Sequence, residues 1–194
     1  MVDMVRRYFS LWRSFFNNSL TRDLEFKANF LGGLIVDIIF YGIQFFFFSI
    51  IYSYVNALGD FTREDVMIFL VITFLADTFY MFFFSGNLFN LNRWMVRGDL
   101  DYFLLRPVES QFMVSFRYVK SYALVSIVIL LIMLTTLIFD YSKPIGILNI
   151  ITFFISFLMG TVLWYSVDFI ISSSCFWFKN FSVSGWLSHE ILKF

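Results

Sequence analysis

The chain has 194 residues, of which 60% are hydrophobic and only 14% are charged. This composition, with a mean hydropathy of +0.79, lies outside the usual range of soluble domains and predicts an integral membrane protein. The formal net charge is zero, so no overall field attracts nucleic acid. A single cysteine and a single histidine exclude an intrachain disulfide and a Cys/His zinc cluster built from this chain alone.

Residues 1–27 are predicted to contain a helix that lies in the membrane interface on the cytoplasmic side. Between residues 5 and 18 the large apolar side chains fall on one helical face, and Arg6, Arg7 and Arg13 fall on the other. Such a helix buries its apolar face among acyl chains while its arginines reach anionic headgroups. Membrane lipids are therefore an expected partner.

A transmembrane domain is predicted over residues 28–178. Four apolar runs are long enough for a helix to cross the hydrocarbon core, which takes roughly 20 residues; they cover residues 30–55, 66–89, 122–139 and 145–171. None shows the alternation of a barrel strand, so the fold class is an all-α polytopic membrane protein with at least four spans. The fourth run stays apolar to Phe178 and ends either as a tilted helix or in a break near residues 172–174.

The distribution of lysine and arginine predicts the orientation of these spans. Of the 14 basic residues, all except Arg63 and Lys143 lie before the first run, between the second and third, or after the fourth. By the positive-inside rule, the N-terminus, a middle loop at residues 90–120 and residues 179–194 face the cytoplasm. Residues 179–194 form either a cytoplasmic tail or the start of further spans.

The stretch RGDLDYFLLRP, residues 97–107, predicts a short helix with specific ends inside the middle loop. Gly98 permits a sharp entry, and Asp99 is expected to be the N-cap. Asp101 falls in the first turn, where the helix dipole favours an anion. Pro107 prevents the helix from continuing.

The same short helix is predicted to carry an apolar face. Leu100, Phe103 and Leu104 recur at i, i+3 and i+4, and Arg106 complements the C-terminal end. A helix of about two turns is not stable alone. We therefore expect a protein partner to receive this face, with docking on the membrane or on the chain's own bundle as the alternative.

The sequence GDLDYFLLRP, after two spans and before a third, resembles the cytoplasmic loop of type-2 ABC transporter permeases, in particular a bacterial subgroup with this signature. The resemblance covers essentially the whole chain. It implies a permease subunit of the bacterial inner or plasma membrane, normally with six spans, that pairs with itself or a sister permease and with two ATPase subunits. It also implies that the loop is a coupling helix seated in the ATPase, a role that carries over to Gly98, Asp99, Leu100, Asp101, Leu104, Leu105, Arg106 and Pro107.

The chain contains no phosphate-binding loop of the form G-x-x-x-x-G-K-[ST]. We therefore expect no cofactor on this chain and do not predict that it is an enzyme. ATP and Mg²⁺ would be bound by the partner ATPase subunit.

Polar residues inside the predicted spans form a second set of candidates. Burying a carboxylate at mid-bilayer costs at least about 2.5 kcal/mol, so such residues usually face a bundle interior or a wet cavity. The candidate pathway residues are Asp37, Gln44, Asp77, Asn87 and Asp168. The alternative is that each carboxyl is protonated or hydrogen-bonded and holds helices together, or reaches toward an interface.

Three functions remain open from the sequence. The first is a permease subunit of an ATP-driven ABC exporter for a hydrophobic or amphipathic compound. The alternative is a proton-coupled secondary exporter that uses the intramembrane Asp residues. A structural membrane scaffold would depend on neither nucleotide nor gradient.

Overall fold

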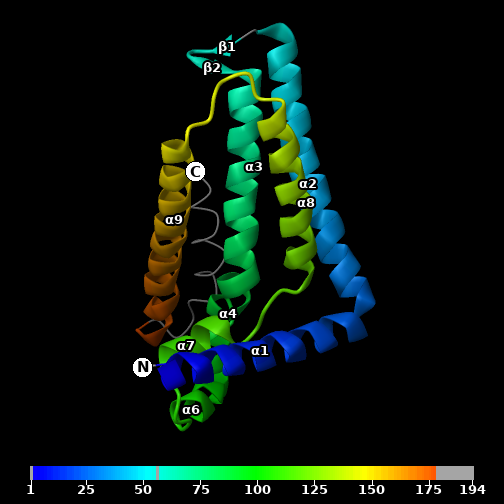
Figure 1. Ribbon diagram of the computed structural model, residues 1–194. Coiled ribbons are helices and arrows are strands. Elements are labelled where there is room, and N and C mark those ends of the chain that lie inside the picture. Colours follow the sequence, from blue (N-terminus) through cyan, green and yellow to red (C-terminus); the bar gives the residue numbers. More distant parts are fainter. Residues whose placement is uncertain (1, 56, 178–194) are drawn as a thin grey trace.

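Four long helices stand side by side in the computed structural model, which describes residues 2–55 and 57–177 (Figure 1). With the helical turns that continue the second to Arg97 and the fourth to Phe176, each is long and apolar enough to cross a membrane. They are α2 (Lys27–Tyr54), α3 (Arg63–Tyr80), α8 (Tyr122–Phe139) and α9 (Ile147–Ser173). The prediction of an all-α polytopic membrane protein is therefore confirmed.

One end of the bundle, here called the loop end, carries α1 and the shorter helices. Helix α1 (Val2–Glu25) lies across the base of the four spans, and the helices of the middle loop pack beside and below it (Figure 1). Within the loop these are α5 (Leu91–Arg97), α6 (Asp99–Leu104) and α7 (Ser110–Phe116), and the short α4 (Gly86–Leu88) leads into them. The loop end thus contains α6, which is the short helix predicted from the sequence, and the elements that pack around it.

The opposite end, here called the hairpin end, holds a small antiparallel hairpin. Strands β1 (Ala57–Leu58) and β2 (Phe61–Thr62) pair Ala57 with Thr62 and Leu58 with Phe61. Gly59 supplies the positive φ of 62° in the turn. Helix α3 begins directly after the hairpin, because Thr62 and Asp65 form a reciprocal capping box.

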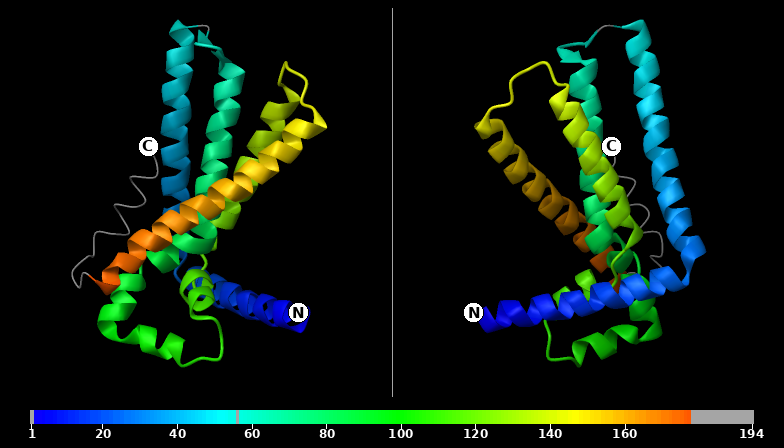
Figure 2. Two further views of the ribbon diagram at one scale, coloured as in Figure 1. Left: turned by 90° about the vertical axis from the view of Figure 1, so that its left-hand side faces the viewer. Right: turned by 45° about the vertical axis from the view of Figure 1, so that its right-hand side comes forward.

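The core of the spans is centred on α3. Val71 and Phe74 of this helix are buried against Leu130 of α8, and the Tyr41 ring of α2 stacks on Phe74 with centroids 4.4 Å apart. Helices α2 and α9 instead expose large apolar side chains along their length. Figure 2 shows α9 inclined to the other spans. In a bilayer such exposed faces carry no hydrophobic penalty, because acyl chains are as apolar as the side chains.

A π-helical turn, Met81–Ser85, continues α3 toward α4. It directs the rings of Phe82 and Phe84 to different neighbours. Phe82 lies 6.2 Å from Phe16 of α1, and Phe84 lies 4.7 Å from Tyr165 of α9, measured between ring centroids. Such turns widen the helix locally and recur at functional sites.

The apolar run of the fourth span breaks where the sequence left two alternatives. Helix α9 ends at Ser173, and a 3-10 turn, Ser174–Phe176, follows it. Cys175 of this turn is fully buried against the loop end. The predicted tail, residues 179–194, lies outside the described residues.

Candidate functional site

The short helix of the middle loop is present as α6, but its N-terminus differs from the prediction. Gly98 adopts a left-handed conformation with φ of 78°, and this residue both ends α5 and occupies the N-cap position of α6. Asp99 is therefore the first residue of the helix. The sequence predicted Asp99 to be the N-cap, and that prediction is wrong. Asp99 stays with Asp101 in the first turn, where the dipole favours their negative charges.

Two residues predicted to contact a partner are instead buried in the protein's own core. Leu100 and Phe103 are only 8% and 4% exposed. The Phe103 ring packs edge-on against Trp94 of α5, with centroids 5.3 Å apart, and the Arg117 guanidinium lies 4.5 Å from its centroid. In this structure Leu100 and Phe103 therefore match the alternative, in which the face docks on the chain's own bundle, and their contact with a partner stays a prediction. Their face of α6 anchors the helix to its own bundle.

The opposite face of α6 is open. Tyr102, Leu104 and Leu105 are 69%, 59% and 82% exposed. Leu104 shares the helical spacing of Leu100 but lies on the outer side, so the predicted apolar face is split between core and surface. Asp101 and Arg106 are exposed beside it.

Helix α1 holds the loop in place at its other end. The Arg7 Nη2 atom donates a hydrogen bond of 3.0 Å to the carbonyl oxygen of Pro107. The backbone N–H of Glu109 donates one of 3.3 Å to the Tyr8 hydroxyl. Tyr8 also packs edge-on against Phe112 of α7, at 4.8 Å between centroids. Pro107 thus ends α6 and also supplies the acceptor that ties the loop to α1.

Residues 118–121, which lead from α7 into α8, form the joint between the loop and the spans. Asn87 accepts the N–H of Tyr118 and donates to its carbonyl oxygen, both at 2.7 Å. Ser19 of α1 accepts the N–H of Val119 at 3.1 Å. Asp23 of α1 accepts both the N–H and the hydroxyl of Ser121. This joint cannot shift without disturbing α1 and α4.

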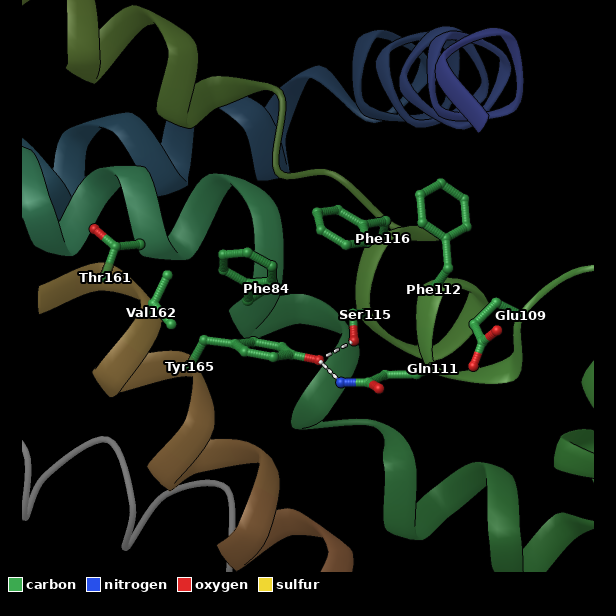
Figure 3. Close-up of a pocket in the computed structure, with 9 residues that line it drawn as sticks. All are labelled: Phe84, Glu109, Gln111, Phe112, Ser115, Phe116, Thr161, Val162 and Tyr165. Atoms are coloured by element: carbon green, nitrogen blue, oxygen red, sulfur yellow. Dashed lines mark hydrogen bonds between the residues drawn. The ribbon is translucent and has the colours of Figure 1, made fainter. Parts of the chain in front are cut away.

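A cavity of about 440 Å³ lies between α7, the π-helical turn and α9 (Figure 3). Phe84, Phe112 and Phe116 supply most of its ring surface. The Tyr165 hydroxyl forms a 2.7 Å hydrogen bond with Ser115 and accepts one of 3.0 Å from Gln111. The cavity is therefore apolar with one polar edge, and the tyrosine joins α9 to the loop.

The candidate pathway residues form hydrogen bonds with different partners. Asp37 of α2 accepts a 2.8 Å hydrogen bond from Ser126 of α8. Asp168 of α9 accepts one from Tyr80 of α3. Both carboxyl groups are buried and join two spans, which is the geometry of the alternative in which such residues hold helices together.

The remaining three candidates differ from one another. Asp77 is buried in α3, and Gln44 is half-buried in α2. Asn87, predicted as a pathway residue, is fully buried, and both ends of its side-chain amide are occupied by Tyr118. Its observed contacts are with the joint of the loop, 31 residues away along the chain.

Sequence reasoning missed the residues that connect the elements. Ser19, Asp23 and Tyr165 were not candidates, because the partner of each lies 50 to 100 residues away along the chain. Lys120 was counted only as a positive charge of the loop. Within residues 2–55 and 57–177, no three side chains of the metal-binding types converge.

Comparison with known proteins identifies the family of this chain. A family described as ABC-2 family transporter protein matches residues 38–194, which is most of the chain. A search of curated proteins and a search of solved structures find no match. The matched region begins within α2 and covers the rest of that span, the other three spans, the loop signature and α6. The chain therefore belongs to the ABC-2 transporter family, as a multi-pass permease component that works with a separate ABC ATPase subunit.

Proposed function

We propose that this chain is the permease subunit of an ATP-driven exporter of a hydrophobic or amphipathic compound. We also propose that the ATPase subunit binds the outer face of α6. The observation that carries the proposal is the division of α6 into two faces. Leu100 and Phe103 lock it into the bundle, while Tyr102, Leu104 and Leu105 stay exposed. In Figure 1, α6 lies at the end of the molecule away from the hairpin, below the spans.

Exposed apolar side chains at such a tip are unlike those on the spans. Spans face acyl chains, but a tip beyond the bundle faces water unless a protein covers it. Exposed apolar residues that adjoin one another usually mark a protein interface. Asp101 and Arg106 flank this tip and would give an ATPase groove charged groups to recognise.

The contacts of the loop support a route from the ATPase to the spans. Force on α6 would reach α1 through the carbonyl of Pro107, α9 through the Tyr165 hydroxyl, and α8 through the joint at residues 118–121. All three connections are short and defined, so displacement of the loop would tilt several spans together. ATP binding and hydrolysis on the partner would set the direction.

The proposed orientation places the loop end in the cytoplasm of a cell bounded by a bacterial inner or plasma membrane. Its support is the distribution of charge, because Arg63 and Lys143 both lie at the hairpin end while the loop end holds Arg22, Arg93 and Lys120. A cytoplasmic loop end is also where an ATPase can reach α6.

A second permease subunit, either a copy of this chain or a sister, completes the proposed transporter. The exposed apolar faces of α2 and α9 support this, because each can pack against another span or against lipid. The cavity of Figure 3 supports an amphipathic cargo, because its phenyl rings accept an apolar body and its Tyr165 edge accepts a polar group.

The test replaces exposed residues of α6 and measures the ATPase that co-purifies with the tagged chain from its native membrane. Leu104→Asp and Leu105→Asp are expected to lose the ATPase subunit and its activity, because a carboxylate would be buried in an apolar groove. Leu105→Met should retain both. Phe139→Asp, at an exposed residue of the hairpin end, is the matched control and should also retain both.

Retention of the ATPase by both Asp variants, with the spans intact, would show that α6 is not its docking element. The proton-coupled exporter stays an alternative, and no contact in the described residues favours it over a structural role for Asp37 and Asp168. Uptake into ATP-free vesicles driven by a proton gradient would support that alternative.

A further inference from the structure

A second cavity at the loop end has a different chemistry from the one in Figure 3. Its volume is about 330 Å³, and it lies between α1, the start of α4, α5 and the joint before α8. Its lining includes three basic side chains, one amide and two aromatic rings, which belong to Arg22, Arg93, Lys120, Asn90, Trp94 and Tyr118. None of the candidate residues of the sequence lines it.

The three cations come from three different elements. Arg22 lies in the last turn of α1 and is paired with Asp23 at 2.9 Å, and its guanidinium lies 5.4 Å from the centroid of the Tyr118 ring. Neither Arg93 nor Lys120 forms an ion pair at contact distance with any residue that the structure describes. Asp23 offsets the charge of Arg22, but three positive charges at one cavity still favour the binding of an anion there.

Lys120 is held at the edge of this cavity by its surroundings. Its backbone N–H donates to the carbonyl oxygen of Phe82, and a Cβ atom at Gly86 would lie 3.8 Å from its Cε atom. Burial lowers the pKa of Lys120, and the carboxylates of Asp37 and Asp77 offset part of that effect. A bound anion would favour the charged ammonium further.

The cavity also lies beside elements that are expected at the membrane–water interface. Helix α1 has the amphipathic pattern of an interfacial helix, and α4 and α5 form the loop-end part of the second candidate span, Arg63–Arg97. Trp94 and Tyr118 are the residue types of the membrane–water interface. Basic pockets at the ends of spans bind anionic lipid headgroups. A guanidinium group can donate two parallel hydrogen bonds to the oxygens of one phosphate.

We propose that this cavity binds a phosphate group, and that the phosphate is the headgroup of an anionic phospholipid. The phosphate chemistry is independent of the proposed ATPase partner, while assignment to the cytoplasmic leaflet rests on the orientation proposed above. The ligand would join α1 and α5 to the residues that lead into α8. An anionic lipid would therefore stiffen the joint through which the loop moves the spans.

The test measures binding to the purified full chain in detergent, by the shift in its thermal unfolding as phosphatidylglycerol, phosphatidylcholine or inorganic phosphate is added at matched ionic strength. We expect phosphatidylglycerol to stabilise the protein and phosphatidylcholine not to. Arg93→Gln and Lys120→Gln should each weaken the apparent affinity for phosphatidylglycerol about tenfold, the effect of losing one hydrogen-bonded charge. Lys120→Arg should restore most of it.

Arg97→Gln is the matched control, because it removes the same charge from the same helix outside the cavity. Stabilisation by inorganic phosphate that Arg93→Gln abolishes would identify a free phosphate as the source and would correct the lipid assignment. Equal effects of the two lipids, or an equal loss in Arg97→Gln and Arg93→Gln, would overturn the site. Because no outcome involves the ATPase, a failure here leaves the docking proposal untouched.

Discussion

The loop end and the hairpin end are held together by different forces. At the loop end, α5, α6, α7 and the turn after α9 share one buried apolar cluster that includes Trp94, Phe103, Met113 and Cys175. At the hairpin end, the connection from α8 to α9 is tied to the start of α3 by polar contacts. The Lys143 ammonium lies 2.7 Å from an Asp65 oxygen, and the Tyr141 hydroxyl donates to the other at 2.5 Å.

This difference indicates how each end responds to force. An apolar cluster that spans several elements resists separation, because every element that leaves exposes buried surface to water. Exposed ion pairs and hydrogen bonds exchange readily for water and contribute little to global stability. The loop end is therefore suited to move as one body, and the hairpin end can part at low cost.

The largest effect is expected from breaking the loop-end cluster. Phe103→Ala removes a buried ring between Trp94 and Arg117 and should lower the free energy of unfolding by about 3–5 kcal/mol. Thermal unfolding in detergent measures this, and Tyr102→Ala, on the exposed face of the same helix, is the control. Similar unfolding temperatures for the two variants would contradict the assignment of the inner face.

A smaller effect is expected at the joint. Asn87→Leu keeps the size of the side chain but leaves the partly buried N–H and carbonyl oxygen of Tyr118 without their partner, at a cost of up to about 1–3 kcal/mol for each group. Asn149→Leu, at an exposed position of α9, should change little. If Asn87→Leu were as stable as the parent chain, Asn87 would not be the residue that holds the joint.

The smallest effect is expected at the hairpin end. Lys143→Gln should speed amide hydrogen exchange in residues 140–146 while leaving the unfolding temperature nearly unchanged, and added salt should reduce the difference. The hydrogen bond to Asp65 raises the pKa of Lys143. Its contribution is therefore complete below the ordinary lysine pKa and is lost only as pH rises through the raised value. A large fall in unfolding temperature would contradict the comparison of the two ends.

Much of the architecture followed from local sequence. The third apolar run was predicted at residues 122–139, and α8 has these bounds. Length and hydropathy are enough to define such a span, because the bilayer sets both. The short helix of the loop was equally local, since Gly98 and Pro107 interrupt the chain on either side of it. The predicted N-cap was wrong by one position, because Gly98 and not Asp99 occupies the N-cap of α6.

The partners of individual side chains did not follow from local sequence. Leu100, Phe103, Leu104 and Leu105 are all apolar, and their spacing cannot say which of them turns inward. Asn87 resembled a polar residue of a pathway until the fold brought Tyr118 beside it. Lys120 resembled an ordinary loop charge until Arg22 and Arg93 were placed around the same cavity.

The sequence by itself determined that this protein crosses a membrane, where its spans run, and that a short capped helix separates the second span from the third. These properties depend on composition and spacing along one segment. Only the tertiary structure decided which face of that helix is buried, what holds the joint to α1 and α4, and where three cations meet. Each of these depends on contacts between residues far apart in the chain, and such contacts leave no periodic signal in any one segment.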